Sequence, residues 1–359
     1  MARLAATKRF AGSAEETQAR RYCRSLLEDR GFSVEDQPFE YSKAPALWGP
    51  SLTSALAATA VWLGAHLATR HQSPALGLLV DLGGLAAIAV LAIWGAKVGV
   101  LGFPAQRSTS TNLVGVRREA GSRPTVWLCA HIDSKSQTIP MLVRVTSTAL
   151  FAFMSVAVAV SILVILFFPG ALSAVEPAAT VLSWLAVVTA LPIVFCFITN
   201  RSNGALDNAT GVAAILLALD EIDRSNNIGV IITSAEELGL AGARHFADTE
   251  TTGEIAINCD TIDDAGFFYC MASGTPSRTL DEAIRRASNG SLQVRPMIPG
   301  ILADNVAFTA KGWESLTVSR GNLGTLGYVH TSRDTSDRLN GTGIAQASSL
   351  IAAIVEELA

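Results

Sequence analysis

The sequence predicts a three-layer α/β sandwich around a mostly parallel, mixed sheet, together with four transmembrane helices in two hairpins. Three observations support this prediction. Short β-branched runs alternate with helical patterns in the polar parts of the chain. Four long apolar runs interrupt this alternation. Half of the 359 residues are hydrophobic and only 16% are charged, which is too apolar for an ordinary soluble enzyme.

The N-terminal part predicts one helix and one strand. Helical spacing of apolar residues extends over residues 13–30, where Ser13 and Glu16 match a capping box and Gly31 is a natural stop. Apolar and polar residues alternate over residues 32–41, which indicates a half-buried strand.

Each of the four apolar runs reaches the ~20 residues that a bilayer span requires. They cover residues 47–69, 75–103, 145–169 and 178–199. Three polar residues fall within the first pair of runs: His66, Asp81 and Lys97. They could be functional groups within the membrane, but we expect them at the membrane interface or snorkelling toward it, since they lie nearer the ends of the spans.

Because a hairpin returns the chain to the side that it left, residues 1–46, 104–144 and 200–359 can form one domain. Residues 47–103 and 145–199 are then the two transmembrane hairpins. Basic residues near the spans lie almost entirely on the domain side: Arg30, Lys43, Arg107, Arg117, Arg118, Arg123, Lys135, Arg144 and Arg201, against Arg70 alone on the far side. The positive-inside rule therefore predicts an integral protein of the cell membrane whose domain faces the cytoplasm.

Two compositional features agree with this placement. Five dispersed cysteines without C-x-x-C spacing indicate buried free thiols in a reducing compartment. A net charge of −4 offers no polybasic field, so nucleic acid is not an expected partner. The oligomeric state is not readable from the sequence.

The domain itself alternates candidate buried strands with helices. The strands are expected at residues 125–129, 228–233, 255–259 and 315–319, and helices at 209–223 and 239–248. In such folds, sites form beyond the carboxyl ends of the strands. The 296–304 loop, with Asp304 and Phe308, is placed where a specificity pocket could form.

Residues that can bind a metal fall at those strand ends: His131, Asp133, Asp207, Glu236, Glu237, Asp260 and His330. Two histidines and several carboxylates match the needs of a pair of zinc ions ~3.5–4 Å apart, with one carboxylate left as a base. Asp133 can hydrogen-bond the other ring nitrogen of His131. Taken singly, Asp207 could instead cap its helix and Asp260 could be a loop acid. His245 is expected to be an ordinary helix residue.

The series H-x-D, D-N-A-x-G, E-E-x-G-L-x-G, N-x-D and H-T-x-x-D-T resembles the co-catalytic zinc exopeptidases of metallopeptidase family twenty-eight, the bacterial leucyl aminopeptidase type. The resemblance covers the whole polar part of the chain. A neighbouring family inserts a lid domain before the last histidine, and the 69 residues between Asp260 and His330 leave no room for one.

This resemblance implies a role for each residue. His131 and Asp260 would bind one zinc ion, Glu237 and His330 the other, and Asp207 would bridge them. Glu236 would be the general base of peptide hydrolysis. The peptide bond between Asp207 and Asn208 is expected to be cis. Tyr328 is a candidate for stabilising the oxyanion, although the family often has a tyrosine directly beside the histidine and Val329 intervenes here.

The leading hypothesis is therefore a membrane-anchored di-zinc aminopeptidase acting on short peptides. A single-zinc glutaminyl cyclase is an alternative, because the run H-I-D-S-K at residues 131–135 is also compatible with that group. A non-catalytic membrane scaffold of the same fold is another. The second hairpin lies between His131 and Asp207, and seven residues separate Thr199 from Asp207. We therefore expect the site within ~25 Å of the end of that hairpin, close to the membrane.

Overall fold

The computed structural model describes residues 1–117, 124–250, 255–298 and 301–358, and not the side chains of residues 94–98. The chain divides into two units. The α/β unit comprises Met1–Lys43, Val100–Ser136 and Thr199–Ala359. The helical unit comprises Ala44–Gly99 and Gln137–Ile198.

The described part of the α/β unit contains an eight-stranded sheet in the order β1-β2-β6-β3-β7-β10-β8-β9. Its strands are β1 (Phe32–Ser42), β2 (Arg107–Arg117), β3 (Val126–His131), β6 (Ile228–Thr233), β7 (Ile255–Ile262), β8 (Phe267–Ala272), β9 (Val294–Pro296) and β10 (Glu314–Gly321). The four central strands β6, β3, β7 and β10 are parallel to one another, and β9 is parallel to β8. The pairs β1–β2, β2–β6 and β10–β8 are antiparallel. This is the mostly parallel, mixed sheet that the sequence predicts.

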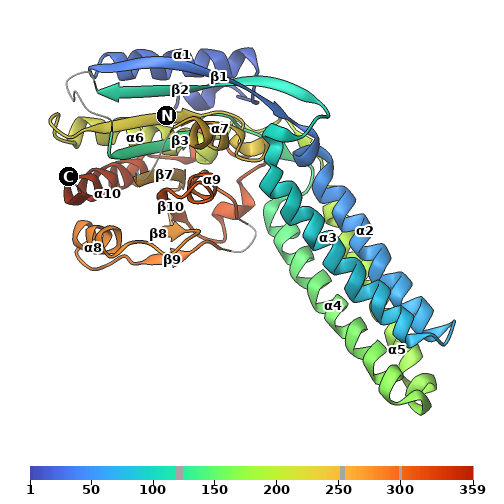
Figure 1. The fold of residues 1–359 in the computed structure, drawn as a ribbon. Coiled ribbons are helices and arrows are strands. Elements are labelled where there is room, and N and C mark those ends of the chain that lie inside the picture. The colour runs from blue at the N-terminus through green and yellow to red at the C-terminus, as the bar shows by residue number, and fades with distance from the viewer. Residues whose placement is uncertain (118–123, 251–254, 299–300, 359) are drawn as a thin grey trace. The chain divides into compact units, whose positions relative to one another are not determined.

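Helices cover both faces of this sheet (Figure 1). Along β3, Leu128 packs into one hydrophobic cluster while Trp127 and Cys129 pack into another, as alternation in a strand requires. The first cluster includes residues of α1 (Ala14–Glu28), α6 (Thr210–Glu221), α8 (Arg278–Ala287) and α10 (Thr342–Leu358). The second includes residues of α7 (Ala241–Thr249) and α9 (Asn305–Thr309). The unit is a three-layer α/β sandwich.

Two strands extend further than the sequence indicates. Strand β3 continues to His131, which pairs with Thr233, and β7 continues to Ile262, which pairs with Arg320 beyond a bulge. The apolar pattern ends earlier because polar residues follow the apolar runs, His131 in β3 and Asp260 and Thr261 in β7. Asp260 consequently lies within a strand and is not a loop acid.

Only half of the expected capping box forms at the start of α1. The Ser13 hydroxyl accepts a hydrogen bond from the Glu16 backbone N–H at 3.1 Å, as expected. The Glu16 carboxylate accepts the N–H of Gly12 at 2.7 Å, one residue before the cap, and also binds the hydroxyl of Ser234. Glu16 is therefore a buried link between the helix and the loop after β6.

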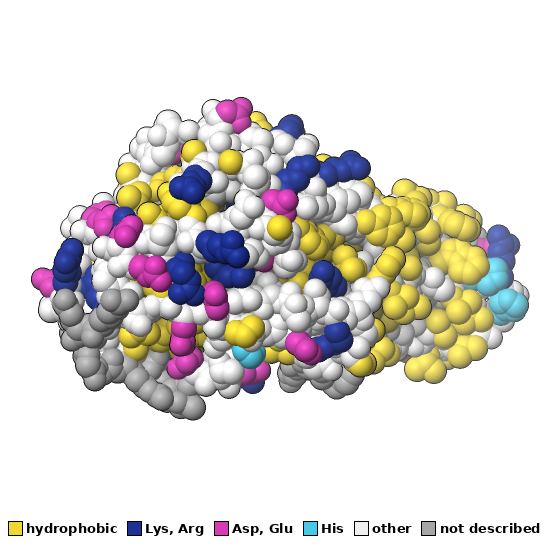
Figure 2. Space-filling view, turned by 90° about the horizontal axis from the view of Figure 1, so that it is seen from above, with side chains coloured by type: hydrophobic (Ala, Val, Ile, Leu, Met, Phe, Trp, Pro, Cys, Tyr) yellow, Lys and Arg dark blue, Asp and Glu magenta, His cyan; other side chains and the backbone are white. Residues whose placement is uncertain are grey.

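The helical unit contains α2 (Ala44–Thr69), α3 (Pro74–Gly102), α4 (Met141–Phe167) and α5 (Leu172–Val194). Four helices of the described chain are long and apolar enough to cross a membrane, over Ala44–Thr69, Pro74–Ile93, Met141–Phe167 and Pro169–Val194. Helix α3 is interrupted at Gly99, where the division between the units falls. Figure 2 shows hydrophobic side chains covering much of the exposed surface of these helices.

Inside the helical unit, Val61 and Ala65 pack with Val158 and Ile162. Arg70, in the loop after α2, and Glu176, near the start of α5, form an ion pair at 2.8 Å. The short strands β4 (Ser136–Gln137) and β5 (Ile198–Thr199) pair with each other.

The polar residues of the first hairpin differ in their surroundings. The His66 ring stacks on Trp62 near the end of α2, with centroids 5.2 Å apart. Asp81 is fully buried and its carboxylate makes no hydrogen bond within the described residues. Its position relative to the membrane interface stays a prediction. The side chain of Lys97 lies outside the described residues.

Candidate metal centre

His131 ends strand β3 with an almost completely buried ring. Its Nδ1 atom lies 3.1 Å from the backbone carbonyl oxygen of Asp133, which can only accept, so Nδ1 carries a proton. Its Nε2 atom lies 3.0 Å from Oδ1 of Asp207, yet it makes no hydrogen bond. An imidazole nitrogen and a carboxylate oxygen that face each other at this distance are a donor pair that a metal cation can hold together.

The Asp133 carboxylate has a different partner from the one expected. Its nearer oxygen is 3.6 Å from Nδ1 of His131, too far for a hydrogen bond, because the Asp133 carbonyl already occupies that position. The two carboxylate oxygens accept the backbone N–H groups of Glu236 and Glu237, each at 3.2 Å. Asp133 thus ties the loop after β3 to the glutamate pair after β6.

Asp207 lies in a single π-type turn, Ala205–Ala209, just before α6. The Asp207–Asn208 peptide bond is cis, as the resemblance implies. Asn208, and not Asp207, supplies the side chain that bonds to the first turn of the helix: its Oδ1 atom accepts the N–H of Gly211 at 3.0 Å. The Asn208 amide also donates to the carbonyl of Cys259 at 2.8 Å, which holds the Asp207 turn beside Asp260. A Cβ atom on Gly211 would lie 2.2 Å from Asn208 Oδ1, so the motif requires glycine there.

The Asp207 carboxylate lies between the two histidines. Its Oδ1 atom is 3.0 Å from Nε2 of His131, and its Oδ2 atom is 3.0 Å from Nε2 of His330. One carboxylate therefore has an oxygen in each half of the cluster, which is the geometry of a bridging ligand.

The glutamate pair follows β6 in a short 3₁₀ turn, Glu236–Leu238, after Ala235 in the left-handed region at φ 54°. The adjacent side chains diverge: Glu237 Oε2 is 3.1 Å from Nε2 of His330, and Glu236 Oε2 is 3.9 Å from Nε2 of His131. The close packing of this turn explains the last glycine of its motif, since a Cβ on Gly242 would lie 2.3 Å from Asn112 Oδ1.

Asp260 completes the cluster, with Oδ1 at 3.7 Å from Nε2 of His131. Potential ligand atoms form two groups that share Asp207: one with His131 and Asp260, the other with Glu237 and His330. The fold thus brings together all five residues expected to bind metal, in the grouping that the resemblance implies. Imidazole nitrogens and carboxylate oxygens are a donor set that zinc accepts.

Tyr328 belongs to neither of these two groups of ligand residues. Its ring packs beneath the Arg338 guanidinium, 3.6 Å from the ring centroid, and Arg333 lies 5.2 Å away on the same ring. Among the described residues its hydroxyl makes no hydrogen bond. Its role at the oxyanion stays a prediction.

The buried carboxylates are electrostatically unbalanced. Burial raises the pKa of Glu236 well above its usual range; His131 opposes this shift, and the charges of Glu237 and Asp260 add to it. Burial also opposes ionisation of Asp207, but the two histidines hold its pKa below the usual range. Burial lowers the pKa of His131, but four neighbouring carboxylates raise it. The net shift of this pKa is strongly upward. Bound cations would offset this concentration of negative charge.

Three residues at the centre were not identified from the sequence as functional. Arg9 is fully buried and donates to the carbonyls of Ile132 at 2.7 Å and Gly204 at 2.8 Å, on both sides of the centre. Lys135 forms an ion pair with Glu237 at 2.7 Å. Asp334 accepts the backbone N–H groups of Leu206 and Asp207. Asp334 could have been found from the sequence, because it is the aspartate of the H-T-x-x-D-T motif. No local pattern marks Arg9.

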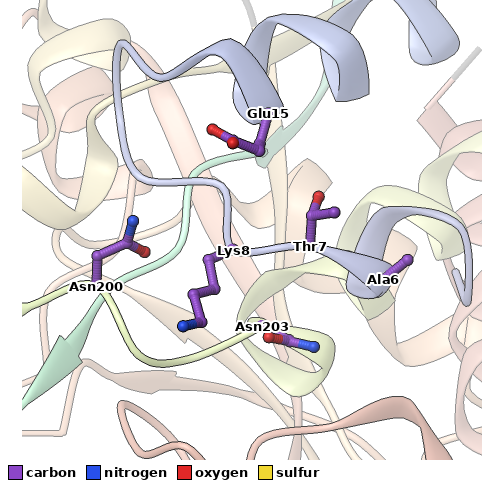
Figure 3. Close-up of a pocket in the computed structure, with 6 residues that line it drawn as sticks. All are labelled: Ala6, Thr7, Lys8, Glu15, Asn200 and Asn203. Carbon is purple, nitrogen blue, oxygen red and sulfur yellow. The ribbon is translucent and has the colours of Figure 1, made fainter.

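A specificity pocket at the 296–304 loop stays a prediction, because residues 299 and 300 of that loop lie outside the described residues. The side chains of Asp304 and Phe308 are fully buried: Asp304 accepts the Thr233 hydroxyl at 2.5 Å, and the Phe308 ring packs against Trp313. A hollow elsewhere in the unit is lined by Ala6, Thr7, Lys8, Glu15, Asn200 and Asn203 (Figure 3). None of those six is a candidate ligand.

Comparison with solved structures agrees with this architecture. An aminopeptidase from Aneurinibacillus sp. strain AM-1 superposes with a TM-score of 0.57 at 15% identity, over 98% of this chain and 90% of that one. A zinc aminopeptidase from Bacillus subtilis gives 0.56 at 15% identity, over 98% and 90%. A glutaminyl cyclase from Fimbriiglobus ruber gives 0.53 at 13% identity, over 99% and 91%. At these identities the similarity shows the fold.

The sequence itself identifies the family. A search of the curated proteins returns no match to this chain. Residues 112–355, about two thirds of the chain, match Peptidase family M28. With that match and the clustered donor set, the chain belongs to Peptidase family M28 and is a zinc metallopeptidase.

Proposed function

We propose that this chain is a membrane-anchored aminopeptidase that uses two zinc ions to remove N-terminal residues from short peptides. One observation carries the proposal: the Asp207 carboxylate has one oxygen at His131 and the other at His330, each at 3.0 Å. A bridging carboxylate between two separate nitrogen donors serves a pair of ions better than a single ion.

Each ion would have its own terminal ligands. His131 and Asp260 would hold one ion, and Glu237 and His330 the other, with Asp207 common to both. When bound, zinc supplies Lewis-acid polarisation of a carbonyl and lowers the pKa of water. The remaining steps fall to side chains of this chain.

Glu236 is the proposed general base. It belongs to neither group of ligand atoms, yet its carboxylate faces His131 from 3.9 Å. It would take the proton of the attacking water and deliver it to the nitrogen of the leaving amine. Asp133 would position this base, because its carboxylate fixes the backbone N–H groups of Glu236 and Glu237 at 3.2 Å each.

The test is hydrolysis of a mixed peptide library by the detergent-purified, zinc-loaded full chain, followed by mass spectrometry. We expect loss of single N-terminal residues with wild type. Glu236→Gln should lose at least about a hundredfold in kcat with unchanged zinc content. Glu35→Gln, at an exposed strand position, is the matched control and should behave as wild type. Turnover by Glu236→Gln at the wild-type rate would refute the assignment of the base.

A glutaminyl cyclase is the second candidate. The observation in its favour is Lys135, the last residue of the H-I-D-S-K run, whose ammonium already pairs with Glu237. The same library distinguishes the two reactions, since a cyclase closes the ring of N-terminal glutamine with loss of ammonia and cleaves no peptide bond. Zinc stoichiometry adds a second criterion.

Membrane anchoring by α2 to α5 is part of the proposal. Its support is the length and apolar composition of these helices. We propose that the α/β unit faces the cytoplasm, which the excess of Lys and Arg in the flanks on the domain side supports.

A further inference from the structure

Asp81 is a buried carboxylate that the proposed peptidase chemistry does not use. It belongs to α3, within the apolar stretch Pro74–Ile93, and its exposed fraction is 0%. Neither of its carboxylate oxygens has a hydrogen-bond partner among the described residues. A buried carboxylate that keeps its charge without a partner is very costly, so the fold must neutralise this group in some way.

Helices α2 and α3 approach each other closely on both sides of this carboxylate. A Cβ atom on Gly64 of α2 would lie 2.7 Å from Cβ of Asp81. A Cβ on Gly77 would lie 2.5 Å from the carbonyl oxygen of Gly64, and a Cβ on Gly84 would lie 2.9 Å from Cβ of Ala60. The residue of α2 that Asp81 packs against is therefore a glycine, which has no side chain to neutralise it.

The other charged groups of the helical unit are engaged elsewhere. Its charged and histidine side chains besides Asp81 are His66, Arg70, His71, Lys97, Arg144 and Glu176. Arg70 pairs with Glu176 of α5, and Arg144 of α4 donates to Gln137. The His66 ring of α2 stacks on Trp62 and meets the His71 ring edge-on.

Lys97 is too far along α3 to pair with Asp81. It follows sixteen residues later in the same helix, which at 1.5 Å per residue is a separation of roughly 24 Å between the two backbone positions. No amino-acid side chain spans that distance. Among the described residues, the unit thus has no cationic side chain that neutralises Asp81.

We propose that Asp81 is a proton-binding site of the helical unit: its carboxyl group carries a proton in the folded chain, and the packing of α2 on α3 requires that proton. A protonated carboxyl becomes a donor, and an O–H group in a helix can bond to the carbonyl four residues earlier, here that of Gly77. A metal cation would need several oxygen ligands, whereas the carbonyls of these helices are used within the helices. This inference goes beyond the proposed function and does not depend on the metal centre.

The first experiment compares infrared spectra of the full chain and of Asp81→Asn, both purified in detergent at pH 8. A protonated carboxylic acid has a carbonyl band separate from the bands of carboxylates, and this band shifts in D₂O. We expect Asp81→Asn to lose such an acid band and to keep all carboxylate bands. Loss of carboxylate bands with an unchanged acid band would overturn the proposal. A carboxylate band of Asp81 that responds to Na⁺ would also overturn it, because the site would then bind a metal cation.

Glu176→Gln is the matched control, because it removes the other carboxylate of the helical unit, which is paired with Arg70 at 2.8 Å. It should lose carboxylate bands and keep the acid band. If Asp81→Asn does not fold, Asp81→Ala replaces it, and an unchanged acid band in that variant would contradict the proposal equally.

Thermal unfolding tests whether helix packing requires the proton. At pH 8 the unfolded chain releases the proton of Asp81 that the folded chain holds, so that this stability is lost as the pH rises. Asp81→Asn has no proton to lose. Its melting temperature relative to wild type should therefore be a few degrees higher at pH 8 than at pH 5. A difference between the two proteins that is the same at both pH values would refute the role of the proton in packing. Neither measurement needs turnover, so the inference stands or fails separately from the peptide assay.

Discussion

The carboxylate of Asp334 accepts the backbone N–H group of Asp207 at 3.2 Å, and that of Leu206 at 2.6 Å. Two buried donors next to the bridging ligand are thus satisfied by one side chain that lies 127 residues further along the chain. Asp334 comes from the same loop as His330, so this contact couples the two loops that carry ligands on either side of the centre.

Asp334→Asn should loosen the Asp207 turn. An asparagine offers one acceptor oxygen where two N–H groups need one each, and its NH₂ group would face a donor. We expect at least about a tenfold loss of metal affinity, measured by titration with a competing chelator. Asp337→Asn, at an exposed position nearby, is the control. Wild-type metal affinity in Asp334→Asn would show that Asp334 does not position the bridge.

The histidines report on the number of ions. In a two-ion centre, His131→Ala and His330→Ala should each lose one equivalent of zinc, since each removes the nitrogen ligand of a different group. Metal content is measured by plasma mass spectrometry on detergent-purified protein. Chelator treatment of wild type should abolish turnover, and added zinc should restore it. A single equivalent in wild type, retained by one of the two variants, would favour a one-ion centre.

Arg9→Met tests the buried guanidinium that links the N-terminal segment to both sides of the centre. It would leave the carbonyls of Ile132, Asn203 and Gly204 without their donor. Hydrogen bonds to a charged group contribute about 1.5–3 kcal/mol each, so we expect a fall of several degrees or more in the melting temperature of the full chain in detergent. Arg285→Met, in an exposed ion pair with Asp281, should change it by a degree or two at most. An equal fall in melting temperature for both variants would contradict the role of Arg9 as a link to both sides of the centre.

The buried carboxyl group of Glu16 should make the folding stability of the chain depend on pH. Burial, with a contribution from Asp133, raises the pKa of Glu16 to about 7 from an ordinary value of 4.5. The folded state therefore holds a proton that the unfolded chain releases, and stability from this group is lost as the pH rises from about 4.5 to about 7. Glu16→Gln should melt higher than wild type at pH 8 and not at pH 5, by thermal scans. A difference that is the same at both pH values would contradict the assignment.

Membrane topology can be read with cysteine labels, because all five native cysteines are buried and free. Gln72→Cys places an exposed thiol in the loop between α2 and α3, and Ser225→Cys places one in an exposed loop of the α/β unit. An impermeant maleimide should label the first in intact cells and the second only after lysis. The opposite pattern would place the α/β unit outside.

Much of the fold and the centre could be predicted from local patterns. The membrane helices follow from length and apolarity alone, and β6 follows from a continuous β-branched run bounded by polar residues. The ligands could be found because parallel strands end at one edge, so that polar residues after different strands come together. Helix α4 begins at Met141, before the expected 145, because its first turn is only moderately apolar.

What the sequence by itself determined is the type of each element, the set of ligand residues and their order along the chain, since these depend on residue chemistry and short-range periodicity. The tertiary structure alone decided the partners. Asp133 bonds to the backbone of Glu236 and Glu237 and not through its carboxylate to His131, Asp260 lies inside a strand, and Arg9, Lys135 and Asp334 surround the ligands. Buried hydrogen bonds and ion pairs are fixed by which donors and acceptors the folded chain brings within about 3 Å, and no local pattern encodes those distances.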